Sequence, residues 1–332
     1  MHIDSARELK ESLLGTLVAP LSEPPRLRSL GVPAGPMPPP GAAPRSVALG
    51  LAPAGGGQYR LAVRLQRRAL EDSGIVESIR RRAKGEVEVR YVGRVSKRAG
   101  VPSQQTRIRP LRLGSSVGHF KITAGTLGAF VRLRSGGEPL ILSNNHVLAN
   151  ENLAKAGDAI LQPGALDGGG LPDDRIGALA GFLKLRRTSA NRIDVATATI
   201  EAGIEIDATK LAPFGRLRGV GPAFIDEGEE VRKVGRTTGA TKGRVTAIEI
   251  DHLIVGYDTG DFRFDDQIEI EGHGTKTFSD GGDSGSLIVD PGGRAVALLF
   301  AGTPDGGSND RGLTYANPIH AVLDGLKVDL VL

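Results

Sequence analysis

Residues 281–289 read GGDSGSLIV, a serine framed by glycines and followed directly by an apolar strand. A serine hydroxyl is a weak nucleophile until a neighbouring base removes its proton. Glycines beside it allow a tight turn that points backbone N–H groups at the charge developing on a substrate carbonyl. We therefore predict that Ser284 is a nucleophile and that the N–H groups of Gly282 and Ser284 form an oxyanion hole. Taken alone, the motif fits a glycine-rich β-turn with an ordinary serine equally well.

Residues 142–148 read LSNNHVL and place a histidine just beyond an apolar strand, where its ring can face a nucleophile from another part of the chain. A lone histidine is more often a hydrogen-bonded surface residue. None of the other five histidines has a comparable setting: His2, His119, His252, His273 and His320. His146 is therefore the candidate general base.

Residues 191–196 read NRIDVA, an aspartate among apolar strand residues. A buried carboxylate needs a hydrogen-bonding partner, and the Nδ1–H of His146 would supply one while the carboxylate fixes the imidazole tautomer. By itself, Asp194 fits a strand-edge residue that faces solvent better than a catalytic one.

The three candidates together favour catalysis. His146, Asp194 and Ser284 follow one another at intervals of 48 and 90 residues, and serine hydrolases of other folds use other chain orders. In order, spacing and local motifs they resemble the chymotrypsin-like serine peptidases. The resemblance implies a double-barrel endopeptidase that cleaves protein or peptide substrates through an acyl-enzyme, with no metal or cofactor. It also implies a homo-oligomer, because relatives assemble.

Other segments carry narrower resemblances. Residues 231–243 (VRKVGRTTGATKG) look like the second-barrel segment of bacterial trypsin-like enzymes. Residues 116–128 and 143–164 resemble the bacterial and plant trypsin-like proteins related to the plant narrow-leaf protein. The likeness covers about residues 111–325 and, more weakly, the unit before them. The chain departs from animal digestive enzymes at Asn144-Asn145 and at Ser286.

The resemblance suggests further roles. Asp283 requires a cationic partner in this fold, and we hypothesise that Lys233 replaces the freshly cut N-terminus of digestive zymogens and supports the oxyanion loop. The primary substrate pocket is expected to have Phe278 near its base and Phe300-Ala301-Gly302 as one wall. An aromatic base favours a small or apolar residue before the cleaved bond, whereas Asp280 and Asp305 favour a basic one. Both specificities stay open.

The domain organisation is inferred from how strand, helix and linker patterns follow one another along the chain. From Gly114 onward short strands recur every ten or so residues with no alternating helices, which indicates an all-β protein with two packed antiparallel six-stranded barrels. The expected strands are 121–123, 127–132, 140–143, 159–162, 177–185, 193–200, 231–234, 243–250, 267–270, 286–289, 295–300 and 313–316. The expected units are a helix in residues 1–18, a Pro/Gly-rich linker at 19–45, a ββαβ accessory domain at 46–96, a basic linker at 97–112 and the peptidase domain at 113–332. Within the last, barrel one spans about 113–212, barrel two about 213–316, and a helix over 318–323 closes the chain.

Composition restricts location and partners. The chain has no cysteine and no apolar run long enough to cross a bilayer, and residues 1–17 lack the apolar core of a secretory signal. These features predict a cytoplasmic protein without membrane attachment. Residues 1–112 hold 20 Lys and Arg against 9 Asp and Glu, a net charge of +11, whereas the rest hold 22 against 29, a net charge of −7. An ordinary solvated surface explains this split best, so a nucleic-acid partner is not expected. Two alternatives remain: a non-catalytic scaffold that binds extended peptides, and a peptidase localised by a basic nucleic-acid-binding region.

Overall fold

The computed structural model describes residues 1–18, 47–92, 95–96, 104–223, 225 and 228–332. The linker predicted for 19–45 and residues 97–103 of the basic linker lie outside the described residues. In the described part, every helix is too short or too polar to span a membrane.

Barrel two is a closed ring of six strands among the described residues. The ring runs in the order β14, β15, β18, β21, β20 and β19 before β19 pairs again with β14, and all its pairings are antiparallel. Its apolar core includes Val231, Val245, Ile270, Ile288 and Ala297. The strands are β14 (Glu230–Gly235), β15 (Gly239–Asp251), β18 (Gln267–Gly272), β19 (Leu287–Val289), β20 (Ala295–Gly302) and β21 (Leu313–Pro318).

Barrel one is a curled sheet whose eight described strands form an open path, β22-β8-β9-β12-β11-β10-β6-β7. Its strands are β6 (Ser116–His119), β7 (Gly125–Thr126), β8 (Ala129–Leu133), β9 (Leu140–Ser143), β10 (Ala159–Leu161), β11 (Arg175–Phe182), β12 (Ala196–Ala198) and β22 (Val328–Leu330). The strand predicted for 121–123 is wrong. The N–H of Ile122 donates to the carbonyl of His119 and closes a turn there, so the strand lies earlier, at β6.

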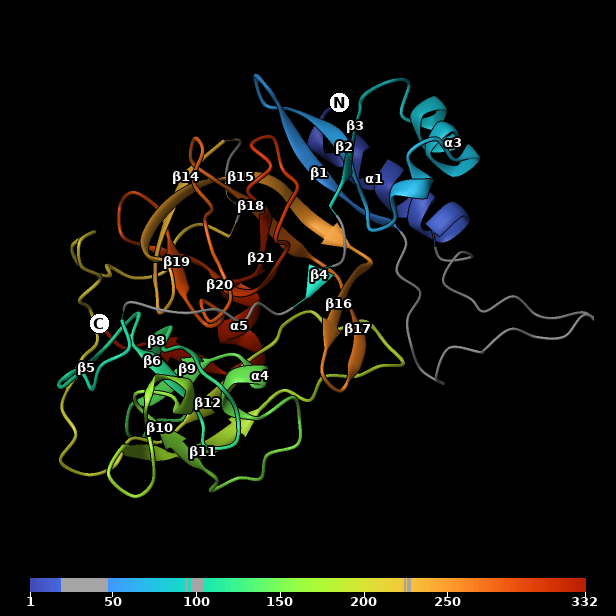
Figure 1. Ribbon diagram of the computed structural model, residues 1–332. Coiled ribbons are helices and arrows are strands. Elements are labelled where there is room, and N and C mark those ends of the chain that lie inside the picture. The colour runs from blue at the N-terminus through green and yellow to red at the C-terminus, as the bar shows by residue number, and fades with distance from the viewer. Residues whose placement is uncertain (19–46, 93–94, 97–103, 224, 226–227) are drawn as a thin grey trace, which may run out of the picture.

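The predicted fold class, all-β with two antiparallel barrels and a small α+β N-terminal part, is confirmed (Figure 1), but barrel one is an open, half-barrel sheet of eight described strands and not a closed six-stranded barrel. The closing helix is α5 (Ile319–Leu326), with Pro318 as its N-cap rather than in its first turn. The remaining short elements of this part are α4 (Asn145–Leu148), η3 (Ala165–Asp167), β5 (Leu111–Arg112) and β13 (Ile206–Asp207).

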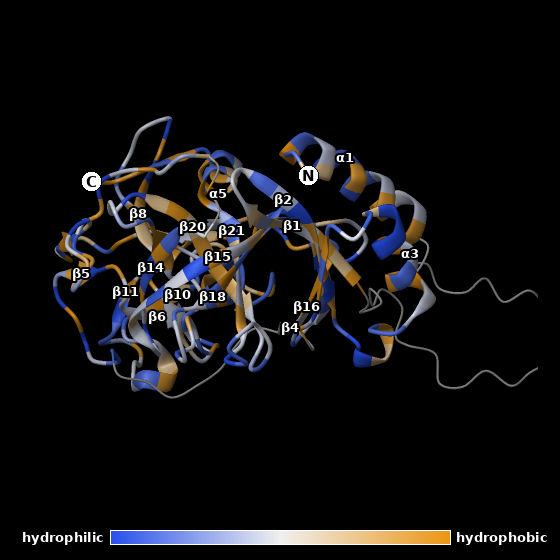
Figure 2. Cartoon of the chain, turned by 90° about the horizontal axis from the view of Figure 1, so that it is seen from above, coloured by the Kyte–Doolittle hydropathy of each residue, from blue (hydrophilic) through white to orange (hydrophobic). Residues whose placement is uncertain are grey.

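The N-terminal elements extend barrel two. Strand β1 pairs with β15, so the barrel sheet continues into β1, β2 and β3. Figure 2 shows α1 and α3 together at this end of the molecule, each with apolar and polar faces. These elements occur in the predicted order, and the division into domains stays a prediction. They are α1 (Ile3–Leu13), η1 (Leu14–Val18), β1 (Val47–Gly55), β2 (Gln58–Leu65), η2 (Arg68–Leu70), α3 (Gly74–Arg82) and β3 (Val87–Tyr91).

Two unpredicted features lie at the other edge of barrel two. A hairpin of β16 (Leu253–Tyr257) and β17 (Gly260–Phe264) projects from it. The two-residue strand β4 (Val95–Ser96) pairs in parallel with β16 and in antiparallel with β20, where Ser96 lies opposite Gly302.

Candidate active site

His146 lies in the single-turn helix α4, directly after strand β9. The helix is fully buried, and the N–H groups of Val147 and Leu148 donate to the carbonyl of Asn144. The His146 side chain is 6% exposed. The position just beyond an apolar strand that LSNNHVL predicted for His146 is confirmed, and the residues after the strand form a single helical turn.

Asp194 lies just before β12, the neighbour of β9 in barrel one. Its carboxylate is completely buried, and its Oδ2 lies 2.5 Å from Nδ1 of His146. The expectation that Asp194 alone would face solvent is thereby wrong. An ionised carboxylate only accepts hydrogen bonds, so Nδ1 must carry the ring proton. In that tautomer Nε2 is an acceptor, and in the described part of the chain it makes no hydrogen bond.

Both oxygens of the Asp194 carboxylate are saturated. Oδ1 accepts the N–H groups of Asn145 (2.7 Å) and His146 (3.3 Å). Oδ2 accepts the His146 ring N–H and the phenol of Tyr257 at 2.7 Å. A carboxylate offers about four lone-pair positions, and all are filled. A fully desolvated charge is tolerable under these conditions.

The side chains of the two asparagines before His146 fix its segment to neighbouring parts of the chain. The side-chain amide of Asn144 donates to the carbonyl of Asp194 at 2.7 Å. That of Asn145 donates to the carbonyl of Leu183 at 2.8 Å and to Asn152 at 2.9 Å. The Asn144 side chain therefore ties the histidine-bearing segment to the aspartate-bearing one, whereas that of Asn145 fixes the same segment to Leu183 and Asn152.

Ser284 lies in a turn that only glycine can build. Gly282 has φ +90° and Gly285 has φ +94°, values that other residues rarely adopt. A Cβ on Gly282 would meet Nη1 of Arg236 at 2.2 Å, and one on Gly285 would meet Oγ of Ser143 at 2.2 Å. The GGDSGS motif is therefore required by both backbone conformation and space.

Backbone contacts hold the Ser284 turn against barrel one. The carbonyl of Ser284 accepts the N–H of Thr126 at 2.8 Å. A Cβ added to Gly125 would touch both the Val147 side chain, at 2.4 Å, and the Ser284 carbonyl, at 3.0 Å. Gly125 therefore lies directly between the Ser284 turn and the helix that carries His146, and there is no room there for a larger residue. Ser284 is 4% exposed, and its hydroxyl donates to the carbonyl of Phe300 at 3.3 Å.

The two candidate oxyanion donors are available. The N–H of Asp283 donates to the carbonyl of Asp280, and that of Gly285 donates to the carbonyl of Leu299. In contrast, the N–H groups of Gly282 and Ser284 donate to no acceptor in the part of the chain that the structure describes.

Asp283 and Lys233 form a buried ion pair at 3.1 Å, and both side chains are 0% exposed. The carboxylate also accepts the N–H groups of Thr237 (2.8 Å) and Asp280 (2.9 Å) and the hydroxyl of Thr238 (2.7 Å). Burial lowers the pKa of Lys233, and the Asp283 charge opposes this effect. The residue that follows the turn also contributes, since the Ser286 hydroxyl donates to the carbonyl of Asp283 at 2.6 Å.

A second buried ion pair supports the same turn and was not predicted. Arg236 follows β14, and its guanidinium makes two hydrogen bonds of 2.5 Å to Asp167 of barrel one, with both side chains 0% exposed. Bidentate pairing of this kind fixes geometry as well as charge. The guanidinium packs directly against Gly282. No local pattern links these two residues, which lie 69 positions apart.

The expected pocket residues divide between two cores. Phe278 is 1% exposed, packs in the barrel-two core and lies with its ring centroid 5.8 Å from Nζ of Lys233. Phe300 is 0% exposed and packs 4.7 Å from Phe264. Ala301 is 2% exposed, and Gly302 ends β20 beside β4. The backbone of β20 thus lies near Ser284 while its aromatic side chain points into the protein.

Two residues around Asp194 were missed by sequence reasoning. Asn317 of β21 accepts the Asp194 N–H at 2.9 Å through its side-chain oxygen. Tyr257 of β16 donates to the carboxylate, and its ring lies edge-on to His146 with centroids 5.6 Å apart. The Asp-Thr-Gly at 258–260 is a turn signal between an apolar run and a run that alternates apolar and polar residues. It could have revealed the hairpin that carries Tyr257, but not the contact of Tyr257 with Asp194.

Another histidine–aspartate pair has a different character. Nε2 of His119 lies 3.1 Å from Asp158, and Nδ1 accepts the N–H of Lys121 at 3.2 Å. Both ring nitrogens are therefore occupied within the protein, and neither is available as a base.

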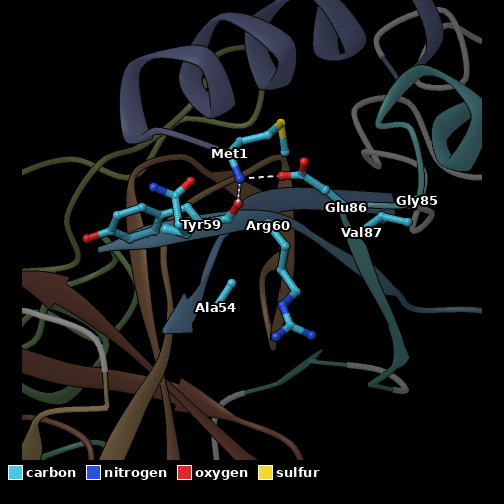
Figure 3. A pocket seen from close by; sticks show the side chains of 8 residues that line it. Met1, Ala54, Tyr59, Arg60, Gly85, Glu86 and Val87 are labelled. Atoms are coloured by element: carbon cyan, nitrogen blue, oxygen red, sulfur yellow. Dashed lines mark hydrogen bonds and ion pairs between the residues drawn. The ribbon is translucent and has the colours of Figure 1, made fainter. Parts of the chain in front are cut away.

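A hollow in the N-terminal unit does not involve the predicted site. It measures about 360 Å³ and is lined by Met1, by residues of β1 and β2, and by the start of β3 with the two residues before it (Figure 3). The Met1 amine donates there to the carbonyl of Tyr59 at 2.7 Å and pairs with Glu86. Its lining contains no candidate catalytic or pocket residue.

Comparison with known proteins gives similarity of structure only. No family model and no curated protein matches the chain. Among solved structures, a glutamic acid-specific serine protease is 21% identical with a TM-score of 0.48, over 67% of this chain and 100% of that one. Thermobifida fusca protease A is 18% identical (TM-score 0.46), and Cellulomonas bogoriensis chymotrypsin is 20% identical (TM-score 0.45); each match covers 67% of this chain and 99% of the other. The chemistry of this site therefore has to be inferred from its own residues.

Proposed function

We propose that the chain is a serine endopeptidase with His146, Asp194 and Ser284 as its catalytic triad. The observation that carries the proposal is the completely buried Asp194 carboxylate, 2.5 Å from Nδ1 of a histidine whose Nε2 is unoccupied among the described residues. A buried charge in this arrangement orients the imidazole and stabilises the imidazolium that forms when it accepts a proton.

In the proposed reaction, Ser284 attacks the peptide carbonyl while His146 takes its proton. The imidazolium then returns the proton to the leaving amine, and water releases the acyl-enzyme by the same route. The N–H groups of Gly282 and Ser284 bind the oxyanion. The hydroxyl must first exchange its bond to the Phe300 carbonyl for one to His146. That bond, at 3.3 Å, is longer than a normal O–H···O bond of about 2.5–3.0 Å, so the exchange costs little.

An extended peptide would bind along β20. The backbone of Gly302 already pairs with an extended segment, since Ser96 of β4 lies opposite it in antiparallel. Adding a strand to a sheet edge uses main-chain hydrogen bonds and accepts many sequences. The side of Gly302 that faces Ser96 can pair with only one strand at a time. We therefore infer that a substrate which reaches Gly302 displaces β4. The pocket roles of Phe278, Phe300 and Ala301, and the preference of the site, stay predictions.

The test is reaction with a fluorophosphonate probe together with cleavage of a denatured protein substrate. Wild type is expected to be labelled and active, and Ser284→Ala to be neither while unfolding at the same temperature. His146→Gln should lose labelling, whereas the matched control His119→Gln, whose ring is equally enclosed but has both nitrogens occupied, should keep it. Cleavage by the Ser284→Ala protein would overturn the proposal.

A non-catalytic peptide-binding scaffold is the alternative that the β4 pairing also favours. It predicts that the wild type binds unfolded peptides yet fails to react with the probe. Such a result would assign the strand-addition edge to binding alone.

A further inference from the structure

We infer that Tyr257 is a positioning residue of the active site, which holds the Asp194 carboxylate and through it the His146 imidazole. This inference rests on the proposed function. It starts from one contact: the Tyr257 hydroxyl donates at 2.7 Å to Oδ2, the same oxygen that accepts the His146 ring N–H.

The Tyr257 phenol can act only as a donor here. An ionised carboxylate has no proton to give. Burial raises the pKa of Tyr257 well above its usual value, and the negative charge of Asp194 raises it further. The side chain therefore stays protonated throughout the range in which a peptidase works.

The ring of Tyr257 is held rigidly. The residue is 5% exposed. The ring packs edge-on to Phe262, with centroids 5.3 Å apart, and stacks with Phe264 at 6.2 Å. On a third side it meets the His146 imidazole at 5.6 Å and 70°. Because the ring is held on three sides, its hydroxyl oxygen stays fixed beside the Asp194 carboxylate.

The hairpin that carries Tyr257 is itself anchored to barrel one. The two residues after it, Asp258 and Thr259, donate their N–H groups to the Glu151 carboxylate at 3.2 and 2.8 Å. Glu151 lies in the loop that follows α4, three residues beyond the helix. Figure 1 shows the β16–β17 hairpin reaching from barrel two toward α4. Tyr257 thereby brings a donor from barrel two to a His–Asp pair that lies wholly in barrel one.

Two consequences follow from removing this donor. One lone-pair position of a buried carboxylate would be empty, so the carboxylate could rotate away from the orientation that holds Nδ1. The charge on Oδ2 would also be shared with one donor instead of two, so it would stabilise the imidazolium more strongly. The first effect lowers the rate. The second moves the acidic limb of the pH–rate profile to higher pH.

The groups that could contribute to such a pH effect are few. In the part of the chain that the structure describes, His146 faces Asp194 from the β12 side and Tyr257 from β16, and Glu151 lies behind Tyr257. Glu151 is engaged by the hairpin N–H groups and is unchanged by a phenol-to-phenyl substitution.

The experiment compares Tyr257→Phe with Tyr315→Phe in the full chain. Tyr315 is the matched control, because it is also buried and donates to a buried carboxylate, Glu269, at 3.1 Å. Tyr257→Phe is expected to lower kcat by roughly 10- to 100-fold, the usual effect of one hydrogen bond to a charged group, with little change in KM and a shifted acidic limb. Tyr315→Phe should leave the pH profile unmoved even where it lowers stability.

A second readout does not depend on activity. The proton between His146 Nδ1 and Asp194 should give a low-field NMR resonance, absent in His146→Gln, that moves in Tyr257→Phe and stays in Tyr315→Phe. If the wild type cleaves nothing but the resonance moves, the proposed function fails and the positioning role survives. If Tyr257→Phe folds and leaves both the resonance and the pH profile unchanged, the positioning role is refuted.

Discussion

The buried pair of Lys233 and Asp283 gives the sharpest test of how the oxyanion turn is supported. Lys233→Met keeps most of the side-chain volume and removes the charge. It leaves the Asp283 carboxylate, 0% exposed, without its cation. Breaking a buried pair by removing one partner costs about 3–5 kcal/mol. Because Thr237, Thr238 and Asp280 still donate to the carboxylate, we expect the lower end, about 3 kcal/mol.

Urea denaturation measures that loss, and fluorophosphonate labelling reports the turn. A turn that no longer presents its N–H groups should label at least tenfold more slowly, since one oxyanion donor contributes about 10²–10³ in rate. The control is Lys242→Met on the same hairpin: Lys242 is 48% exposed, 3.5 Å from Glu230, and should change stability by no more than about 0.5 kcal/mol.

A double-mutant cycle completes the test. Lys233→Met combined with Asp283→Asn removes both charges, so the double variant should be more stable than the two single losses predict, by about 1–3 kcal/mol. A Lys233→Met protein as stable and as reactive as the wild type would refute the idea that this pair supports the turn.

Three further predictions concern other parts of the chain. Gly282→Ala should abolish labelling, since its Cβ would meet Arg236 at 2.2 Å, whereas Gly274→Ala, at φ +63° with nothing within 4 Å, should keep it. Ser96→Pro, which removes a backbone N–H from β4, should raise kcat/KM several-fold for long peptides and leave fluorophosphonate labelling unchanged; no gain with long peptides would contradict displacement of β4. Burial raises the pKa of Glu269, but the neighbouring Arg64 outweighs this effect and holds that pKa below its usual value. The pair therefore stabilises the fold above about pH 4.3, and its contribution is lost as the pH falls below that value. In urea titrations, Arg64→Leu should lack this acid-side loss, and its free energy of unfolding at pH 7 should be lower by about 3–5 kcal/mol.

The sequence predicted much of the fold because its signals are local. Period-two apolar patterns and glycine-rich turns located most strands of barrel two, from 231–234 to 313–316. It misplaced the strand expected at 121–123, because a turn closed by Ile122 and His119 has the same apolar and polar alternation over three residues. It passed over β16, a short run of apolar residues without period-two alternation, and β17, where Asp261 and Arg263 separate the apolar residues.

The candidate site was likewise predictable where the signals are local and unpredictable where they are not. Sequence alone could identify His146, Asp194 and Ser284 as candidates, since each has a distinctive neighbourhood and their order restricts the fold. It could also identify the glycines of the turn, because a φ near +90° has a simple residue requirement. It could not decide whether Asp194 was buried or exposed, and the solvent-facing interpretation of that residue by itself was wrong.

Only the tertiary structure decided what surrounds the charges. Tyr257 lies 63 positions from Asp194, Arg236 lies 69 from Asp167, and Asn317 lies 123 from Asp194. Desolvation makes these contacts matter, because a buried charge must find its donors wherever the folded chain brings them. A local sequence pattern reflects interactions between residues that are close in the chain. The environment of a buried carboxylate depends on which distant strands pack against it, and no short stretch of sequence determines that packing.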